Sequence, residues 1–357
     1  MSEELIKLKN MSQINNLPTA DQVDDNQKVV VRLDLDLPFL DGQILDNSRL
    51  IKSMPTIRLL LEKGCRLVII GHRGRPRVDN LKDREELSLK SVYVELMSLL
   101  EEGEDSVSSV FVEETTNRDI IFQALEDNQI VFLENLRFWR EENEGKVDFL
   151  GHLVEIGSVF VNDALAVAHR ENASVLLAKM MPTFYGMAFA REVEKMSQIL
   201  LEPKKPLLII LGGVKEDKLD QLPILASKAD RILIGGKLPT YKEKYTDLSN
   251  VVWGQLDESG MDIGKLTIDR FISEIEMAGT VLLAGAMGKF EDAKHKEGSQ
   301  LITEAVARSE AVKMAAGGDT KAGILEMGLV DRFDYICSGG GVALEFLARD
   351  GKLPAWD

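Results

Sequence analysis

The stretch LLIILGGVKEDK, residues 207–218, contains the pattern on which the fold depends. A strand-length aliphatic run comes first, two glycines follow it, and a polar segment begins directly after them. An aliphatic run without alternation predicts a strand that is buried on both faces of a parallel sheet. The glycines predict a turn into a helix, where bare backbone N–H groups can bind a phosphate.

The same order of apolar run, turn and amphipathic segment recurs along the chain. Strands are predicted at residues 29–34, 66–71, 110–112, 130–133, 159–163, 207–212, 231–235, 281–284, 314–316 and 335–338. Helices are predicted between them, as at residues 53–63, 89–100 and 302–307. This alternation predicts an α/β fold with doubly wound, Rossmann-like parallel sheets. Residues 239–262 are polar and lack a clear period, so no element is predicted there.

Length and composition narrow the class of protein. A chain of 357 residues predicts about two domains, and a helix at 187–201 followed by prolines at 203 and 206 predicts a connector between two lobes. The net charge of −16 argues against a nucleic-acid-binding protein. No apolar run has the length of a membrane span, and the start resembles no secretory signal. Cys65 and Cys337 lie in predicted strands, which favours core residues in a cytoplasmic protein.

Arginines lie in or beside the motifs that end the predicted strands of the first half. They are Arg49, Arg75, Arg137 and Arg170. A single arginine in such a place is usually a surface ion pair. Four of them at strand ends favour a shared pocket, because the carboxyl ends of parallel strands meet at one edge. Guanidinium groups suit a small polyanion such as a phosphorylated carboxylic acid.

Glycine clusters end the strands of the second half, and charged residues accompany them. Lys215 and Lys218 are three residues apart, so one helix face can present both to a phosphoryl group. Asp319, in the run GGDT, is either a helix N-cap or a carboxylate for Mg²⁺. The glycines 339–341 open the last helix and can hold a phosphate through their amides. The chain has no G-x-x-x-x-G-K-[ST] or G-x-G-x-x-G motif, so any phosphoryl transfer uses another architecture.

In combination these motifs resemble phosphoglycerate kinase, in the correct order and over most of the chain. The motifs are VRLDLDLP (31–38), GHRGRP (71–76), LENLRF (133–138), VNDA with AHR (161–170), GAMG with FE (285–291), GGDT (317–320) and SGGG (338–341). The resemblance implies a hinge-bending kinase. Its parts would be a phosphoglycerate-binding lobe (1–184), a connecting helix (185–204), a nucleotide-binding lobe (205–345) and a C-terminal tail (346–357).

The resemblance also implies a reaction, namely reversible phosphoryl transfer between 1,3-bisphosphoglycerate and MgADP in a cytoplasmic monomer. The implied phosphoglycerate ligands are Asp34, Asp36, Arg49, His72, Arg75, Arg137 and Arg170. The groups implied to act on the transferring phosphoryl group are Arg49, Lys215, Gly340 and Gly341. The implied nucleotide site comprises Gly212, Gly213, Lys218, Gly236, Glu291, Gly317, Gly318, Asp319 and Thr320, with Asp319 on the Mg²⁺.

Several positions depart from the family's motifs. Asp36 stands in place of an asparagine and Arg73 in place of an apolar residue, so we hypothesise that Arg73 offsets the charge of Asp36. Lys237 replaces a glycine, the loop before Lys218 is one residue shorter, and the region 239–262 is trimmed. These changes gather at the nucleotide site. Two alternatives therefore stay open, namely a catalytically weak phosphoglycerate-binding or regulatory protein and an unrelated α/β sugar-phosphate enzyme.

Overall fold

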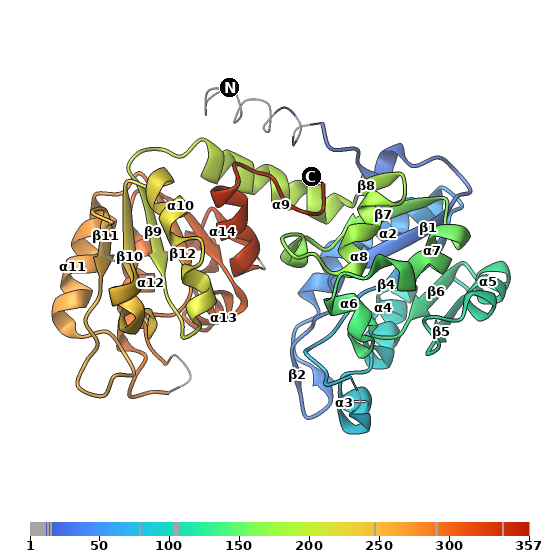
Figure 1. The fold of residues 1–357 in the computed structure, drawn as a ribbon, viewed down its shortest axis with the longest axis horizontal. Helices are drawn as coiled ribbons and strands as arrows, with labels where there is room; N and C mark the ends of the chain where they lie inside the picture. Colours follow the sequence, from blue (N-terminus) through green and yellow to red (C-terminus); the bar gives the residue numbers. More distant parts are fainter. Residues whose placement is uncertain are drawn as a thin grey trace. The chain divides into compact units, whose positions relative to one another are not determined.

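The computed structural model describes residues 12, 14, 16–78, 80–102, 107–245, 248–289, 292–337 and 339–356, which form two compact units (Figure 1). The N-terminal unit comprises residues 15–193 and 354–357, and the C-terminal unit comprises residues 1–14 and 194–353. The division falls inside helix α9 (Met187–Met196), which continues as a π-helical segment over Ser197–Leu201. The limits predicted for the lobes and the tail stay predictions.

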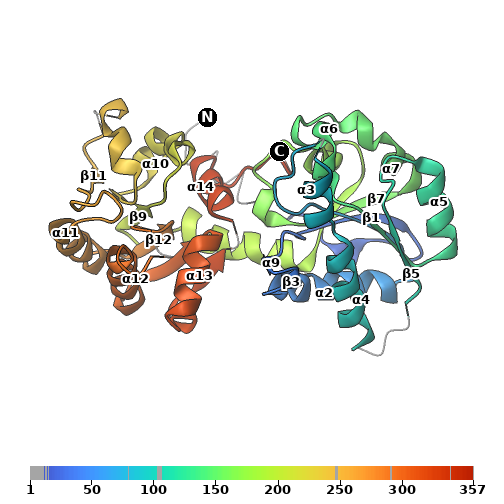
Figure 2. The same ribbon diagram turned by 90° about the horizontal axis from the view of Figure 1, so that it is seen from below.

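A parallel six-stranded sheet forms the centre of the N-terminal unit. Its strands, in spatial order, are β5 (Ser109–Val112), β6 (Ile130–Leu133), β4 (Arg66–Ile70), β1 (Lys28–Leu33), β7 (Val159–Asp163) and β8 (Thr183–Tyr185). The helices around it are α2 (Ser48–Glu62), α3 (Leu81–Glu86), α4 (Lys90–Glu101), α5 (Arg118–Asp127), α6 (Arg140–Asn143), α7 (Gly151–Ile156) and α8 (Ala173–Leu176). Figure 2 shows α2 and α4 on one side of the sheet and α7 on the other.

Alternating side chains of the strands enter two hydrophobic cores. Val29 and Val31 of β1 pack with α2 and α4, whereas Val30 packs with α5, α7 and α8. Both faces are thus covered, which explains why the strands are apolar at every position. Because helices occupy the faces, polar groups of this sheet can gather only at its edges and ends.

The C-terminal unit repeats the architecture with another parallel six-stranded sheet. Its strands, in spatial order, are β11 (Val251–Trp253), β10 (Arg231–Ile234), β9 (Leu207–Leu211), β12 (Thr280–Ala284), β13 (Val312–Ala316) and β14 (Tyr335–Cys337). Its α-helices are α10 (Leu222–Lys228), α11 (Lys265–Glu276), α12 (Glu297–Arg308), α13 (Gly318–Glu326) and α14 (Gly340–Ala348). The strand order reverses between β9 and β12, the position where ligands bind in open α/β sheets.

The predicted fold class is confirmed, and each predicted strand is present. The short edge strands β8 and β11 were not predicted, and β11 lies inside the region 239–262, where no element was expected. The same region contains most of the 3₁₀ helix η8 (Leu238–Lys244). Cys65 and Cys337 are buried, as expected for core residues. Within the described residues, no helix has the length and apolar character needed to cross a membrane.

Candidate functional site

Charged side chains of the N-terminal unit gather at the carboxyl ends of four adjacent strands, β6, β4, β1 and β7. Asp34 and Asp36 directly follow β1, and His72 follows β4. Arg137 lies in the 3₁₀ helix η2 (Leu136–Phe138) after β6, and Arg170 lies in the loop after β7. Two of the four arginines that were predicted to share a pocket, Arg137 and Arg170, thus lie at the same end of the sheet as these groups. We call this group, together with Arg32 and Arg49, the arginine pocket.

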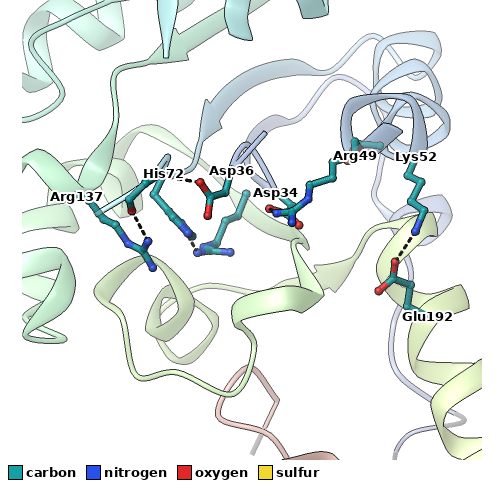
Figure 3. A network of polar contacts seen from close by, with 10 residues as sticks. Asp34, Asp36, Arg49, Lys52, His72, Arg137 and Glu192 are labelled. Atoms are coloured by element: carbon teal, nitrogen blue, oxygen red, sulfur yellow. Dashed lines mark hydrogen bonds and ion pairs between the residues drawn. The ribbon is translucent and has the colours of Figure 1, made fainter. Parts of the chain in front are cut away.

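Arg49 enters the arginine pocket from the first turn of α2. Its guanidinium NH1 lies 2.8 Å from Oδ1 of Asp34 in a half-buried ion pair (Figure 3). Burial opposes the charge of Arg49, but Asp34, with smaller contributions from Asp36 and Asp46, outweighs burial and raises the pKa of Arg49. Asp34 therefore holds the arginine in place and keeps it charged.

His72 is buried in the centre of the arginine pocket and is neutral at physiological pH. Burial, followed by the charges of Arg137, Arg32, Arg170 and Arg49, holds the pKa of His72 well below its usual value. Its Nδ1 lies 3.4 Å from NH2 of Arg32. Since a guanidinium only donates hydrogen bonds, Nδ1 is the acceptor and Nε2 carries the proton. Nε2 is then a hydrogen-bond donor for a ligand.

Arg32 belongs to the arginine pocket, although the sequence analysis did not select it as a site residue. It is fully buried on β1, and its Nε donates to Oγ of Ser174 at 2.9 Å. The Ser174 hydroxyl in turn donates to the buried carboxylate of Glu142 at 2.6 Å. NH1 of Arg32 has no hydrogen-bond partner among the described residues. The available signal was an arginine inside an otherwise apolar strand, a position where an unpaired charge is costly unless a ligand uses it.

A single glycine links Asp36 to Arg137. The N–H of Gly74 donates to Oδ1 of Asp36 at 2.8 Å, and its carbonyl accepts from NH1 of Arg137 at 2.6 Å. Gly74 has φ of +62°, a conformation that other residues rarely adopt. Burial and the neighbouring Arg170 lower the pKa of Arg137 to about 10, so it stays charged at pH 7. Asp36 thus positions Arg137 through the backbone of the 71–76 loop.

Arg73 points away from the pocket centre, toward hydrophobic and backbone groups. Its guanidinium carbon lies 3.3 Å from the ring centroid of Phe39, and NH1 donates to the carbonyl of Ser88 at 3.1 Å. Burial lowers the pKa of Arg73, and Asp36 is the strongest opposing charge. No direct ion pair joins Arg73 and Asp36 among the described residues, so any compensation acts through space. Arg75, by contrast, is exposed.

In the C-terminal unit, glycines from three strand ends pack against one another. The N–H of Gly213 donates to the carbonyl of Ala286 at 2.8 Å, and that of Gly236 donates to Met287 at 3.0 Å. A Cβ on Gly285 would lie 2.2 Å from the carbonyl oxygen of Gly212, so only glycine fits there. We call these segments, 212–213, 235–236 and 285–287, the glycine cradle.

Lys218 reaches back over the glycine cradle. It lies in the 3₁₀ helix η7 (Glu216–Leu219), and its Nζ donates to the carbonyl of Gly212 at 2.7 Å. Burial lowers the pKa of Lys218, and the nearby Asp319 is the strongest opposing charge. Lys215 directly precedes η7 and is exposed. The two lysines therefore lie at the same strand end, one held on the cradle and one open to a ligand.

Asp319 lies near Lys218 in the first turn of α13, not at its cap. Gly317 is the N-cap, with φ of +107°, so the interpretation of Asp319 as an N-cap is wrong. The hydroxyl of Thr320 accepts from the N–H of Gly285 at 2.9 Å, which joins α13 to the cradle. Gly340 opens α14, and a Cβ on it would lie 3.4 Å from Cα of Gly317. Glu291, predicted for the nucleotide site, lies outside the described residues.

The donor groups near Asp319 fit a magnesium ion that is carried by a nucleotide. Among the described residues, no three His, Cys, Asp or Glu side chains come together as a metal cage. One exposed carboxylate beside a partly buried lysine is sufficient when phosphate oxygens and water complete the coordination.

Comparisons with known proteins point to one family. The family model for phosphoglycerate kinase matches residues 20–249 and 240–350. Phosphoglycerate kinase of Leptospira biflexa is 31% identical, with 90% of this chain and 92% of that protein aligned. The enzyme of Thermus thermophilus is 30% identical, with 92% and 95% aligned.

Solved structures agree with this result. Phosphoglycerate kinase from Coxiella burnetii has a TM-score of 0.73 at 26% identity, covering 95% of this chain and 98% of that one. The structure from Pyrococcus horikoshii has a TM-score of 0.75 at 24% identity, covering 95% and 97%, and supports the fold.

Proposed function

Because the chain belongs to the phosphoglycerate kinase family, a group of phosphotransferases with a carboxyl acceptor, we propose that it catalyses that family's reaction. The reaction transfers a phosphoryl group reversibly between 1,3-bisphosphoglycerate and MgADP, yielding 3-phosphoglycerate and MgATP in glycolysis and gluconeogenesis. In this proposal the enzyme is a cytoplasmic monomer with small-molecule substrates.

The observation that carries the proposal is the arginine pocket. Four guanidinium groups act on one buried, neutral histidine, and two of them, those of Arg32 and Arg137, keep a buried N–H without a partner among the described residues. So much positive charge is unfavourable in the free protein and favourable around a phosphorylated carboxylate. Arg32, Arg49, Arg137 and Arg170 would bind the anionic groups, and Nε2 of His72 would donate one further hydrogen bond.

Asp36 has a positioning role in this proposal. Its carboxylate already accepts from Gly74 and thereby orients the peptide that holds Arg137. A carboxylate would repel the acid group of the substrate if it faced it directly. Asp34 acts in a similar way, because its ion pair fixes Arg49.

The glycine cradle and its lysines would bind the nucleotide. Lys218 would contact the phosphates from its place above Gly212, and Asp319 would hold Mg²⁺ with phosphate oxygens. When bound, Mg²⁺ neutralises charge on the phosphates. Lys215, Arg49 and the amides of Gly340 and Gly341 would stabilise the charge that is spread over the transferring phosphoryl oxygens. Transfer needs groups from both units in one reaction and the exclusion of water.

A coupled assay of ATP formation from 1,3-bisphosphoglycerate and MgADP tests the proposal. We expect turnover that Lys215→Ala reduces by at least about a hundredfold, since the lysine acts on the transferring group. Calorimetry with 3-phosphoglycerate distinguishes this proposal from the alternative of a phosphoglycerate-binding or regulatory protein. Binding without turnover, in the presence of several nucleoside diphosphates, would instead favour a binding or regulatory protein.

A further inference from the structure

Lys237 directly follows one segment of the glycine cradle and has no role in the functions described so far. It follows the buried glycines 235 and 236 at the end of β10, and its own side chain is exposed. Its backbone is fixed, because its N–H donates to the carbonyl of Gly213 at 2.8 Å and its carbonyl accepts from the hydroxyl of Thr240 at 2.7 Å. The position of this lysine relative to the cradle is therefore well defined.

The ammonium group of Lys237 is available to a ligand. Within the described part of the chain, it makes no hydrogen bond or ion pair. The acidic side chain on the neighbouring η7, Glu216, is bound by Lys244, with Nζ and Oε1 2.5 Å apart. Lys218, the partly buried cation of the cradle, is directed to the carbonyl of Gly212. An exposed lysine on a rigid backbone beside a ligand site is well placed to recognise part of that ligand.

The strand order indicates which part of a nucleotide Lys237 meets. Asp319, the proposed carboxylate for Mg²⁺, follows β13, whereas Lys237 follows β10. The strands β9 and β12 lie between them, so the two strand ends are separated by three interstrand spacings, about 14 Å. A nucleotide with its Mg²⁺-bearing phosphates at Asp319 that extends along the cradle past Lys218 would bring its base toward β10.

We propose that Lys237 selects the nucleobase and favours a 6-oxopurine, guanine or hypoxanthine, over adenine. This inference rests on the proposed function. An ammonium group only donates hydrogen bonds. The outer edge of guanine presents two acceptors, O6 and N7, whereas adenine presents the acceptor N7 beside a donor amino group. Lys237 thus complements guanine and is mismatched to the amino group of adenine.

Equilibrium binding of three Mg-nucleoside diphosphates, GDP, IDP and ADP, tests the assignment. For the unaltered protein we expect GDP and IDP to bind about tenfold or more tightly than ADP, since a hydrogen bond from a charged donor is worth at least that factor. IDP lacks the 2-amino group of guanine, so equal binding of IDP and GDP locates the selection at O6 and N7. The ratio of affinities is the readout, because general attraction to the phosphates cancels in it.

Substitutions at Lys237 give the direct test. Lys237→Met should weaken the binding of GDP and IDP by about tenfold and change the affinity for ADP by less than about twofold. Lys237→Gln offers a donor and an acceptor, the pair that matches adenine, and should shift the preference toward ADP. The matched control is Lys242→Met, because Lys242 is an exposed lysine on the 3₁₀ helix η8, which begins directly after Lys237, and should leave all three affinities unchanged.

Several results would overturn the inference. An ADP preference or equal affinities in the unaltered protein, or a GDP-to-ADP ratio that Lys237→Met does not change, would show that Lys237 does not read the base. An equal loss of affinity for all three nucleotides would show that Lys237 binds the phosphates and does not read the base. If nucleotides bind and turn over without discrimination, only this inference fails. If no purine nucleotide binds, the proposed function fails with it.

Discussion

Replacing Asp163 by asparagine should remove a pH-dependent loss of stability from the N-terminal unit. Asp163 ends β7 and is buried, and its two oxygens accept from the N–H of Phe189 at 2.9 Å and from the hydroxyl of Thr56 at 2.8 Å. Burial raises the pKa of Asp163 to about 7, and the nearby carboxylate of Glu192, which Figure 3 shows beside Lys52, adds to the rise. Two hydrogen bonds are thus insufficient to compensate for the loss of water.

The sign of the effect follows from proton binding. Between pH about 4 and about 7, the folded protein keeps a proton on Asp163 that the unfolded chain releases, so the free energy of unfolding falls as pH rises. The pKa of Asp163 rises from 3.8 to about 7. At about 1.4 kcal/mol per pH unit, this rise corresponds to a total change of about 4 kcal/mol in the free energy of unfolding. About 2.5 kcal/mol of this lies between pH 5 and pH 8.

Urea unfolding at pH 5 and pH 8 measures the effect. A Trp253→Phe background removes the tryptophan of the C-terminal unit. Trp139 and Trp356 then report on the N-terminal unit, where Trp356 packs 5.7 Å from Phe189. The unfolding free energy of the parent minus that of Asp163→Asn should fall by about 2.5 kcal/mol from pH 5 to pH 8. The subtraction cancels the contributions of histidines, which are common to both proteins.

The control is Asp24→Asn, which changes an exposed carboxylate of the same unit. The difference in unfolding free energy between the parent and Asp24→Asn should be the same at the two pH values. A difference for Asp163→Asn that stays constant within about 0.5 kcal/mol would refute the reasoning, because Asp163 would then titrate alike in the folded and unfolded states.

Two further predictions concern the two sites. Gly285→Ala should destabilise the C-terminal unit by about 2 to 5 kcal/mol, since φ is +117° and the new Cβ would lie 2.2 Å from the carbonyl of Gly212. Urea unfolding checks this, with Gly318→Ala as a control because open space surrounds that position. Arg73→Leu should weaken 3-phosphoglycerate binding far less in an Asp36→Asn background than alone, as calorimetry on the four proteins would reveal. Equal losses in both backgrounds would exclude compensation between Arg73 and Asp36.

The sequence predicted the buried strands well and the short edge strands poorly. Fully apolar runs such as β9 carry a strong signal, because both faces of the sheet are covered. The edge strand β11 has three residues in a polar region, so its pairing with β10 depends on tertiary contacts that periodicity does not report. Helix α2 begins at Ser48, although a start at residue 53 was predicted. Tertiary packing of Leu50 and Met54 carries the helix past Pro55.

The candidate site could be predicted at the level of position, but not of role. That strand-end arginines meet follows from parallel topology alone. The role of Asp36 could not be predicted, because it depends on the hydrogen bond to Gly74 and on the carbonyl that Gly74 offers to Arg137. Arg32 was missed because it lies within the apolar strand β1, whereas the site residues were sought at and after the strand ends.

The decisive measurement is the detection of an acyl phosphate. The protein would be incubated with 3-phosphoglycerate and γ-labelled MgATP or, in a parallel reaction, MgGTP. The product would then be treated with hydroxylamine, which forms a hydroxamate at the acyl carbon and releases the label as inorganic phosphate. We expect labelled, hydroxylamine-sensitive product that requires 3-phosphoglycerate and is lost in both Arg137→Met and Lys218→Met, since each variant disables one of the two sites. No such product with either nucleotide, from a folded protein that still binds 3-phosphoglycerate, would contradict phosphoryl transfer to a carboxyl group.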